Sequence, residues 1–230
     1  MSAPPVAVVT GAGGGMGRAI VLDLAATHQV HALARRADSV ADLPAHVRVH
    51  LGDLRDPAHL DRVVEAVGQV DVLINAAAIG HPLGVAEATA EQWHDQLTTN
   101  VIAPAELTRR LLPGLRARQG TVIFIGSGAG TRPVPGSAVY TASKHALRGL
   151  ADVLRIDEAP HRVRVATVAP GQTDTPMLQA SMSAGGQPYT PERYISPASV
   201  AAAVRYVVDA PPDVQITDVA VRPRVEISRL

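Results

Sequence analysis

Residues 6–17, VAVVTGAGGGMG, decide the fold of this 230-residue chain. Val6–Thr10 is a short apolar run that ends in a glycine cluster, which predicts a buried strand entering a turn. Glycines let a backbone turn tightly and approach a pyrophosphate, and a helix that starts after them offers free N–H groups. The stretch therefore predicts a phosphate-binding turn between the first strand and the first helix; the alternative is a flexible turn without a ligand.

The spacing of the glycines separates classes of nucleotide-binding turn. It fits T-G-x-x-x-G-x-G and does not fit G-x-G-x-x-G. No G-K-[ST] pair follows, which argues against a P-loop nucleotidase. The residues of this turn that we expect to bind the dinucleotide are Thr10, Gly11, Gly15, Met16 and Gly17.

Apolar runs that predict strands alternate with helical segments along the rest of the chain. The expected strands are 30–34, 47–51, 70–74, 120–125, 163–168 and 216–221, and the expected helices are 18–27, 60–67, 91–112, 139–158 and 197–208. The apolar runs are continuous, as strands covered on both faces require. The sequence therefore predicts an α/β fold, a Rossmann-type doubly wound parallel sheet with helices on both faces, as a single domain of residues 1–230.

Composition excludes several classes of function. Hydrophobic residues make up 47% of the chain, the formal net charge is zero and there is no cysteine. A neutral chain gives no support for a nucleic-acid or anionic-membrane partner, because both favour a basic field. No apolar run reaches the length of a membrane span, and residues 1–9 do not resemble a signal peptide. We expect a cytoplasmic protein without disulfides or a metal site, since the nine histidines show no ligand pairing.

Lys144 is the only lysine of the chain, and it follows Tyr140 by four residues. Arginine supplies all other basic charges, so this position selects a compact ammonium over a guanidinium. Residues i and i+4 share one face of a helix, so the two side chains point the same way. An ammonium beside a phenol is expected to lower the pKa of the phenol.

The end of the second predicted strand bears on the choice of dinucleotide. An NAD site usually has an acidic residue there, but this chain has Arg35 and Arg36. A guanidinium pair suits a 2′-phosphate, so NADP(H) is favoured, with NAD(H) as the alternative if both arginines are merely solvated. Asp53 and Leu54, after the third predicted strand, are expected to flank the adenine.

Together with the glycine turn, four further segments in chain order resemble the short-chain dehydrogenase/reductase family in its single-domain form. They cover the chain from about residue 6 to residue 177. The matching segments after the glycine turn are Asn75-Ala76-Ala77-Ala78, Asn100, the set Ser127, Tyr140 and Lys144, and Pro170-Gly171-Gln172-Thr173-Asp174-Thr175. Tyr-x-x-x-Lys alone is frequent by chance, whereas the ordered set is specific.

The resemblance implies a division of roles. Tyr140 would exchange a proton with a carbonyl or alcohol oxygen, Ser127 would orient that oxygen, and Lys144 would bind the nicotinamide ribose. Asn100 would hold a water that links Lys144 to solvent, or it would serve only as a structural amide. The other residues implied to contact the cofactor are Asn75, Ala76, Ala77, Pro170, Gly171, Thr173 and Thr175. The implied activity is hydride transfer between NADP(H) and a small, moderately apolar carbonyl or secondary alcohol; the alternative is a non-catalytic dinucleotide sensor or partner-binding protein on the same fold.

Two features depart from the family pattern, and a third concerns the substrate. Ala78 stands where the family usually has glycine. Residues 216–230 lack the frequent G-x-x-x-x-V-D-G-G ending and instead form a predicted strand with an Arg/Pro-containing tail. Residues 176–196, rich in methionine, glycine and tyrosine, are expected to cover the substrate. The resemblance implies a homodimer or homotetramer.

Overall fold

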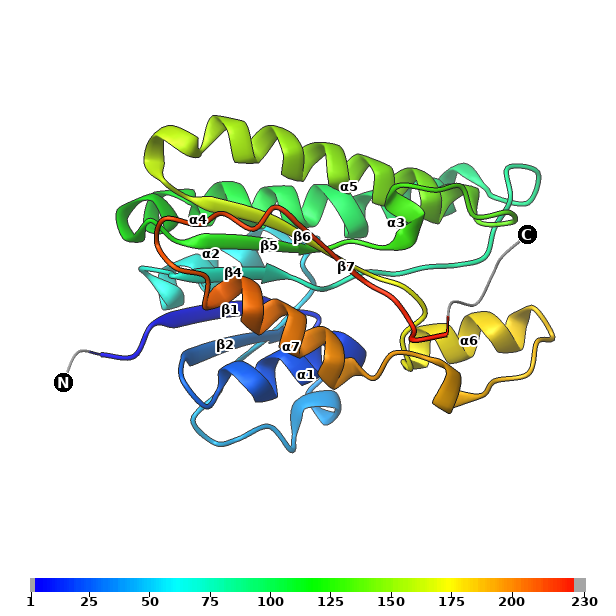
Figure 1. The fold of residues 1–230 in the computed structure, drawn as a ribbon, viewed down its shortest axis with the longest axis horizontal. Coiled ribbons are helices and arrows are strands. Elements are labelled where there is room, and N and C mark those ends of the chain that lie inside the picture. Colours follow the sequence, from blue (N-terminus) through cyan, green and yellow to red (C-terminus); the bar gives the residue numbers. More distant parts are fainter. Residues whose placement is uncertain (1–2, 226–230) are drawn as a thin grey trace.

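A single parallel sheet organises the chain in the computed structural model, which describes residues 3–225 (Figure 1). Its strand order is β3-β2-β1-β4-β5-β6-β7. The strands are β1 Val6–Thr10, β2 Gln29–Ala34, β3 Arg48–Leu51, β4 Val72–Asn75, β5 Thr121–Ile125, β6 Arg164–Pro170 and β7 Asp218–Val221. The central strands are buried throughout, which explains why their sequences are continuous apolar runs.

Helices cover both faces of the sheet, as Figure 1 shows. The α-helices are α1 Gly15–Leu24, α2 Pro57–Val67, α3 Ala90–Leu97, α4 Ala103–Arg118, α5 Ala138–Asp157, α6 Pro176–Ala184 and α7 Pro197–Val208. Helices α1 and α7 pack on one face through aliphatic side chains such as Ile20 and Val204. Helices α2, α4 and α5 cover the other face through residues such as Leu60, Leu111 and Leu147. The fold is thus a doubly wound α/β sheet.

The strand order reverses beside β1, which lies between β2 and β4. In open parallel sheets a ligand crevice forms at such a reversal, outside the carboxyl ends of the strands. The loops that follow β1, β4, β5 and β6 all leave from this edge, and α6 lies beyond it (Figure 1). The fold therefore brings the sequence motifs to one edge of the sheet.

Most predicted elements are confirmed with end shifts of a few residues, and the exceptions have physical causes. Helix α1 begins at Gly15, three residues before the predicted start, so the glycine turn itself forms its first turn. The predicted helix 91–112 is divided by the π-helix Thr98–Ile102. Helix α4 continues through Pro113 to Arg118 because its last turn buries Leu115 against the sheet. None of the described helices is long and apolar enough to cross a membrane.

Candidate active site

The glycine turn is shaped by close backbone approach. A Cβ atom on Gly17 would lie 2.2 Å from the carbonyl oxygen of Gly11, so any side chain there would collide. Gly11 has φ +72, and a Cβ on it would lie 2.9 Å from Ala77. Gly14 differs, because a Cβ on it would meet nothing within 4 Å. The turn therefore packs tightly on one side and leaves an open side at the start of α1, where a phosphate can meet free N–H groups.

Thr10 joins the glycine turn to the segment after β4. Its Oγ1 accepts hydrogen bonds from the backbone N–H groups of Ala76 and Ala77, both at 3.0 Å. Asn75 points away from this loop into the interior, where its Nδ2 donates to Thr108 Oγ1 at 3.2 Å. Thr10 thus holds the two loops together through its buried hydroxyl, while the buried Asn75 ties the end of β4 to α4.

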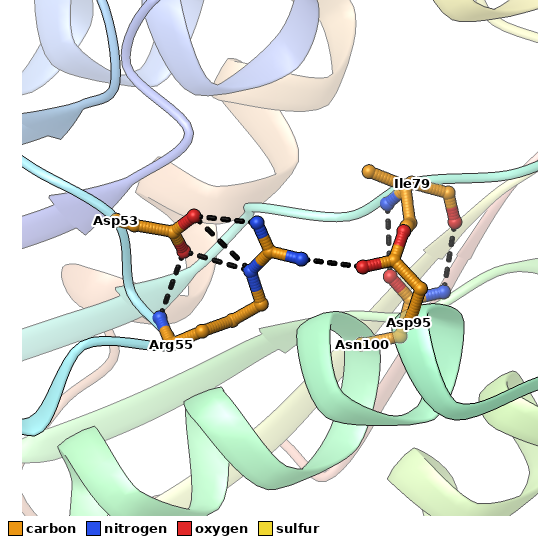
Figure 2. Close-up of polar contacts among 5 residues, drawn as sticks. All are labelled: Asp53, Arg55, Ile79, Asp95 and Asn100. Carbon is orange, nitrogen blue, oxygen red and sulfur yellow. Dashed lines mark hydrogen bonds and ion pairs between the residues drawn. The ribbon is translucent and has the colours of Figure 1, made fainter. Parts of the chain in front are cut away.

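Asp53, which follows β3, is held by a neighbouring arginine. Arg55 donates to the Asp53 carboxylate through its backbone N–H, Nε and Nη2, and it also pairs with Asp95 of α3 (Figure 2). The Arg55 hydrogen bond holds the pKa of Asp53 below its usual range, and Arg35 adds to this effect. Arg35 and Arg36 are exposed, and Arg36 pairs with Asp38 at 3.2 Å. Asp53 is thus an ionised acceptor, flanked by guanidinium groups.

Ser127, Tyr140 and Lys144 meet at the carboxyl end of β5. Ser127 follows this strand, and its Oγ hydrogen-bonds the Tyr140 phenol and accepts from the Ala129 N–H at 3.2 Å. The Lys144 side chain is buried, and its Nζ lies 5.7 Å from the centroid of the Tyr140 ring. Lys144 Nζ donates to the carbonyl oxygen of Ile125 at 3.0 Å. The i, i+4 spacing on α5 does bring phenol and ammonium to the same face.

The expectation that Lys144 lowers the pKa of Tyr140 is wrong for the protein alone. Burial raises the pKa of the Tyr140 phenol, and the hydrogen bond from Ser127 only opposes this shift. Burial lowers the pKa of Lys144 to about 8. Burial disfavours the charged phenolate, so Tyr140 is held in its protonated form at neutral pH.

Asn100 has a structural role that extends to Tyr140. Its Oδ1 accepts from the Ile79 N–H and its Nδ2 donates to the Ile79 carbonyl, both at 2.8 Å (Figure 2). The same Nδ2 lies 3.0 Å from Ser143 Oγ, which donates to the Tyr140 carbonyl oxygen at 2.8 Å. Asn100 therefore ties the β4 loop to α5 from within the π-helix, with its side chain fully engaged.

The turn after β6 brings a third loop to the site. Thr173 is buried, and its hydroxyl donates to the Gly171 carbonyl at 3.2 Å. Thr175 caps α6 by accepting from the Leu178 N–H at 3.3 Å. Its methyl group faces the glycine turn, because a Cβ on Gly15 would lie 3.0 Å from Thr175 Cγ2. The turns after β1 and β6 are thus in contact.

Two further residues border Tyr140: Gly80, which the sequence motifs did not single out, and Met177, which lies in the segment expected to cover the substrate. A Cβ on Gly80 would lie 3.1 Å from Tyr140 Cδ2 and 3.5 Å from Met177 Sδ. The phenol ring, the Gly80 backbone and the α6 thioether therefore meet at one point. Gly80 lies only a few residues after the Asn75 segment. No local sequence pattern predicts that it approaches the Tyr140 ring, because this closeness depends on the fold.

The observed geometry fits a dinucleotide. The open side at Gly14, the N-terminus of α1 and the contact between the β1 and β6 turns lie at the carboxyl edge of the sheet, and Lys144 binds the end of β5 at the same edge. Within residues 3–225 no group of three or more His, Cys, Asp or Glu side chains is placed to hold a metal ion. Fold and site together define a dinucleotide-binding oxidoreductase of the Rossmann class.

The comparisons narrow this class to one family. A family model described as short chain dehydrogenase matches residues 5–185. L-xylulose reductase of Bos taurus is 36% identical over 186 residues, which cover 77% of this chain and 75% of that protein. The chain therefore belongs to the short-chain dehydrogenase family.

Other similar proteins share the fold but differ in size and bound cofactor. The chain is 30% identical to glycine betaine reductase ATRR of Emericella nidulans over 96% of its own length but only 19% of that protein. An actinorhodin polyketide ketoreductase with NADPH superposes with a TM-score of 0.85 at 27% identity, covering 95% of both chains. The 3-ketoacyl-(acyl-carrier-protein) reductase of Brucella melitensis, complexed with NADH, has a TM-score of 0.85 at 25% identity, covering 95% of this chain and 97% of that one.

Proposed function

We propose that this protein transfers hydride between NADP(H) and the carbonyl or secondary alcohol of a small, moderately apolar substrate. The observation that carries the proposal is the contact of Ser127 and Tyr140 beside the buried Lys144, at the edge where the glycine turn begins α1. A protein that only senses a dinucleotide has no use for a buried proton donor with an orienting hydroxyl.

The nicotinamide, when bound, supplies or accepts the hydride. Ser127 donates a hydrogen bond to the substrate carbonyl oxygen and orients it beside the phenol. Tyr140 gives its proton to that oxygen as negative charge develops, and burial favours this direction because it keeps the phenol protonated. In the reverse direction, a phenolate of Tyr140 takes the alcohol proton, which requires higher pH.

Lys144 binds the nicotinamide ribose hydroxyls with its remaining donors. Its Nζ is already fixed by the Ile125 carbonyl, so the ammonium is positioned before the cofactor arrives. With a pKa of about 8, the Lys144 amine is charged at neutral pH. This pKa is close enough to neutrality for the amine to release and regain a proton. We infer that the proton lost by Tyr140 is replaced by way of Lys144, which lies on the same face of α5.

The phosphates and the carboxamide are assigned to the loops. The glycine turn, from Thr10 to Gly17, binds the pyrophosphate, and the turn from Pro170 to Thr175 binds the carboxamide. The exposed Arg35 and Arg36 bind the 2′-phosphate, which supports NADP(H) over NAD(H). Asp53, whose carboxylate is bonded to Arg55, and Leu54 are assigned to the adenine.

Residues 176–196 cover the substrate in this proposal. The contact of Met177 with Gly80 beside the Tyr140 ring supports it, because α6 thereby closes one side of the site. Assembly as a homodimer or homotetramer is supported by exposed aliphatic side chains on α5, where Val153 is 57% and Ile156 is 70% exposed.

A screen of ketones and alcohols with both cofactors tests the proposal. Nicotinamide absorbance reports turnover, and Tyr140→Phe is expected to abolish it while dinucleotide affinity persists. Tyr206→Phe is the matched control, because that tyrosine lies 65% exposed on α7. Full activity of Tyr140→Phe would reject the mechanism. For the cofactor, Arg35→Ala with Arg36→Ala should weaken NADPH much more than NADH, and equal loss would reject the 2′-phosphate assignment.

A further inference from the structure

The segment after β7 lies against two loops of the candidate site. It is the part of the chain that departs from the family ending and that the proposed function leaves without a role. Gly171 donates its N–H to the Val221 carbonyl at 2.8 Å, which continues the β6–β7 pairing beyond Pro170. Arg222 and Pro223 therefore lie beside the beginning of the Pro170-Gly171 turn, and both are partly buried.

Arg222 is bonded to backbone alone. Its Nη1 donates to the Ala169 carbonyl at 2.9 Å and to the Val221 carbonyl at 3.3 Å. Among residues 3–225 no carboxylate pairs with this guanidinium. The Arg222 side chain therefore joins backbone to backbone and forms no ion pair within this part of the chain.

The guanidinium also lies beside the Ser127 loop. A Cβ on Gly128 would be 3.6, 3.8 and 3.9 Å from Nη2, Cζ and Nη1 of Arg222. A side-chain carbon at Gly128, the residue next to Ser127, would therefore be in van der Waals contact with the face of the guanidinium. Pro223 packs on the other loop, since a Cβ on Gly171 would lie 3.1 Å from Pro223 Cδ.

One side chain thus bonds to the carboxyl end of β6 and lies next to Gly128 in the loop that follows β5. We propose that Arg222 is a positioning residue that fixes Ser127 against Tyr140 by clamping the Gly128 backbone to the end of β6. The proposal rests on the proposed function. Arg222 takes no part in the proton transfer itself.

The clamp has a consequence that a general structural role would not have. The Ser127 hydrogen bond opposes the burial effect and so lowers the pKa of Tyr140. If the Gly128 backbone moves, that bond lengthens and the pKa of Tyr140 rises further. The Lys144 ammonium on α5, which faces the same ring, stays the same in every variant.

Arg222→Ala and Arg222→Lys test this, with Arg224→Ala as the matched control because Arg224 is exposed two residues further on. For Arg222→Ala we expect kcat of alcohol oxidation to fall about tenfold, since small misplacements of reacting groups are costly. We also expect its rise with pH to move to higher pH, while the dinucleotide Kd stays within about twofold. Arg222→Lys keeps a donor for the Ala169 carbonyl and should recover part of kcat.

Several results would overturn the proposal. Arg222→Ala could match Arg224→Ala in kcat and pH profile, or it could raise KM alone, which would make Arg222 a substrate contact instead. Where Arg222→Ala does not fold, Arg222→Met keeps the aliphatic stem beside Gly171 while it removes the guanidinium from Gly128, and so it decides the question. If wild type turns over no carbonyl or alcohol, the proposed function fails separately. The clamp is then tested by ultraviolet titration of Tyr140, read as the difference between each protein and its Tyr140→Phe version; an unchanged titration in Arg222→Met would reject it.

Discussion

Replacing Thr10 by valine removes one oxygen and leaves the shape of the side chain intact. That oxygen accepts the N–H groups of Ala76 and Ala77, both at 3.0 Å, and Thr10 is 2% exposed. An unsatisfied buried donor costs about 1–3 kcal/mol. Both N–H groups are only partly buried, so the lower limit applies to each, and Thr10→Val should lower the free energy of unfolding by about 2 kcal/mol.

Urea unfolding followed by circular dichroism measures this loss, with Thr10→Ser as the matched control. Serine keeps the acceptor and loses one methyl group, which should cost about 1 kcal/mol. The loop after β4 should also move away from the glycine turn in Thr10→Val, so NADPH should bind more weakly than in Thr10→Ser. Equal stability of the two variants would refute the reasoning, because it would show that water or a loop shift satisfies the two donors without cost.

Two further predictions concern buried charge. Arg116→Met should lower the free energy of unfolding, because it removes the partner of the Glu158 carboxylate, which is 3% exposed and held at 2.7 Å. Arg109→Met breaks an exposed pair and should change the free energy of unfolding much less, as urea unfolding can show. Burial and the neighbouring His50 lower the pKa of His31 to about 4. Between about pH 6.5 and 4 the unfolded chain therefore binds a proton at His31 that the folded chain does not bind. The free energy of unfolding should fall as the pH drops through this range. His31→Leu should flatten that part of the stability profile, and an unchanged slope would contradict the assignment.

The glycine turn could be predicted because its requirements are local. A tight turn before a helix needs glycine at particular positions whatever the rest of the chain does, and the collision at Gly17 shows the constraint. The strands were predictable for a related reason, since burial on both faces leaves a continuous apolar run. The Tyr140–Lys144 pair followed from helix periodicity alone.

The π-helix was beyond reach of sequence patterns. Its central residue, Asn100, is fixed by Ile79, 21 residues earlier, and by Ser143, 43 residues later. The pKa of Tyr140 was predicted in the wrong direction for a similar reason. A sequence shows that an ammonium is near the phenol, but it does not show how much protein surrounds both, and burial decides the sign.

The burial of Lys144 gives a second reason why arginine is excluded there. Its side chain is 3% exposed, and its Nζ donates to the Ile125 carbonyl within the described part of the chain. A guanidinium at the same place would bring five N–H donors and a larger planar group into a site built around one ammonium. The unsatisfied donors alone would cost several kcal/mol. The lone lysine therefore reflects packing as well as the proposed proton transfer, and a protein that lost its activity would still be expected to keep arginine out of this position.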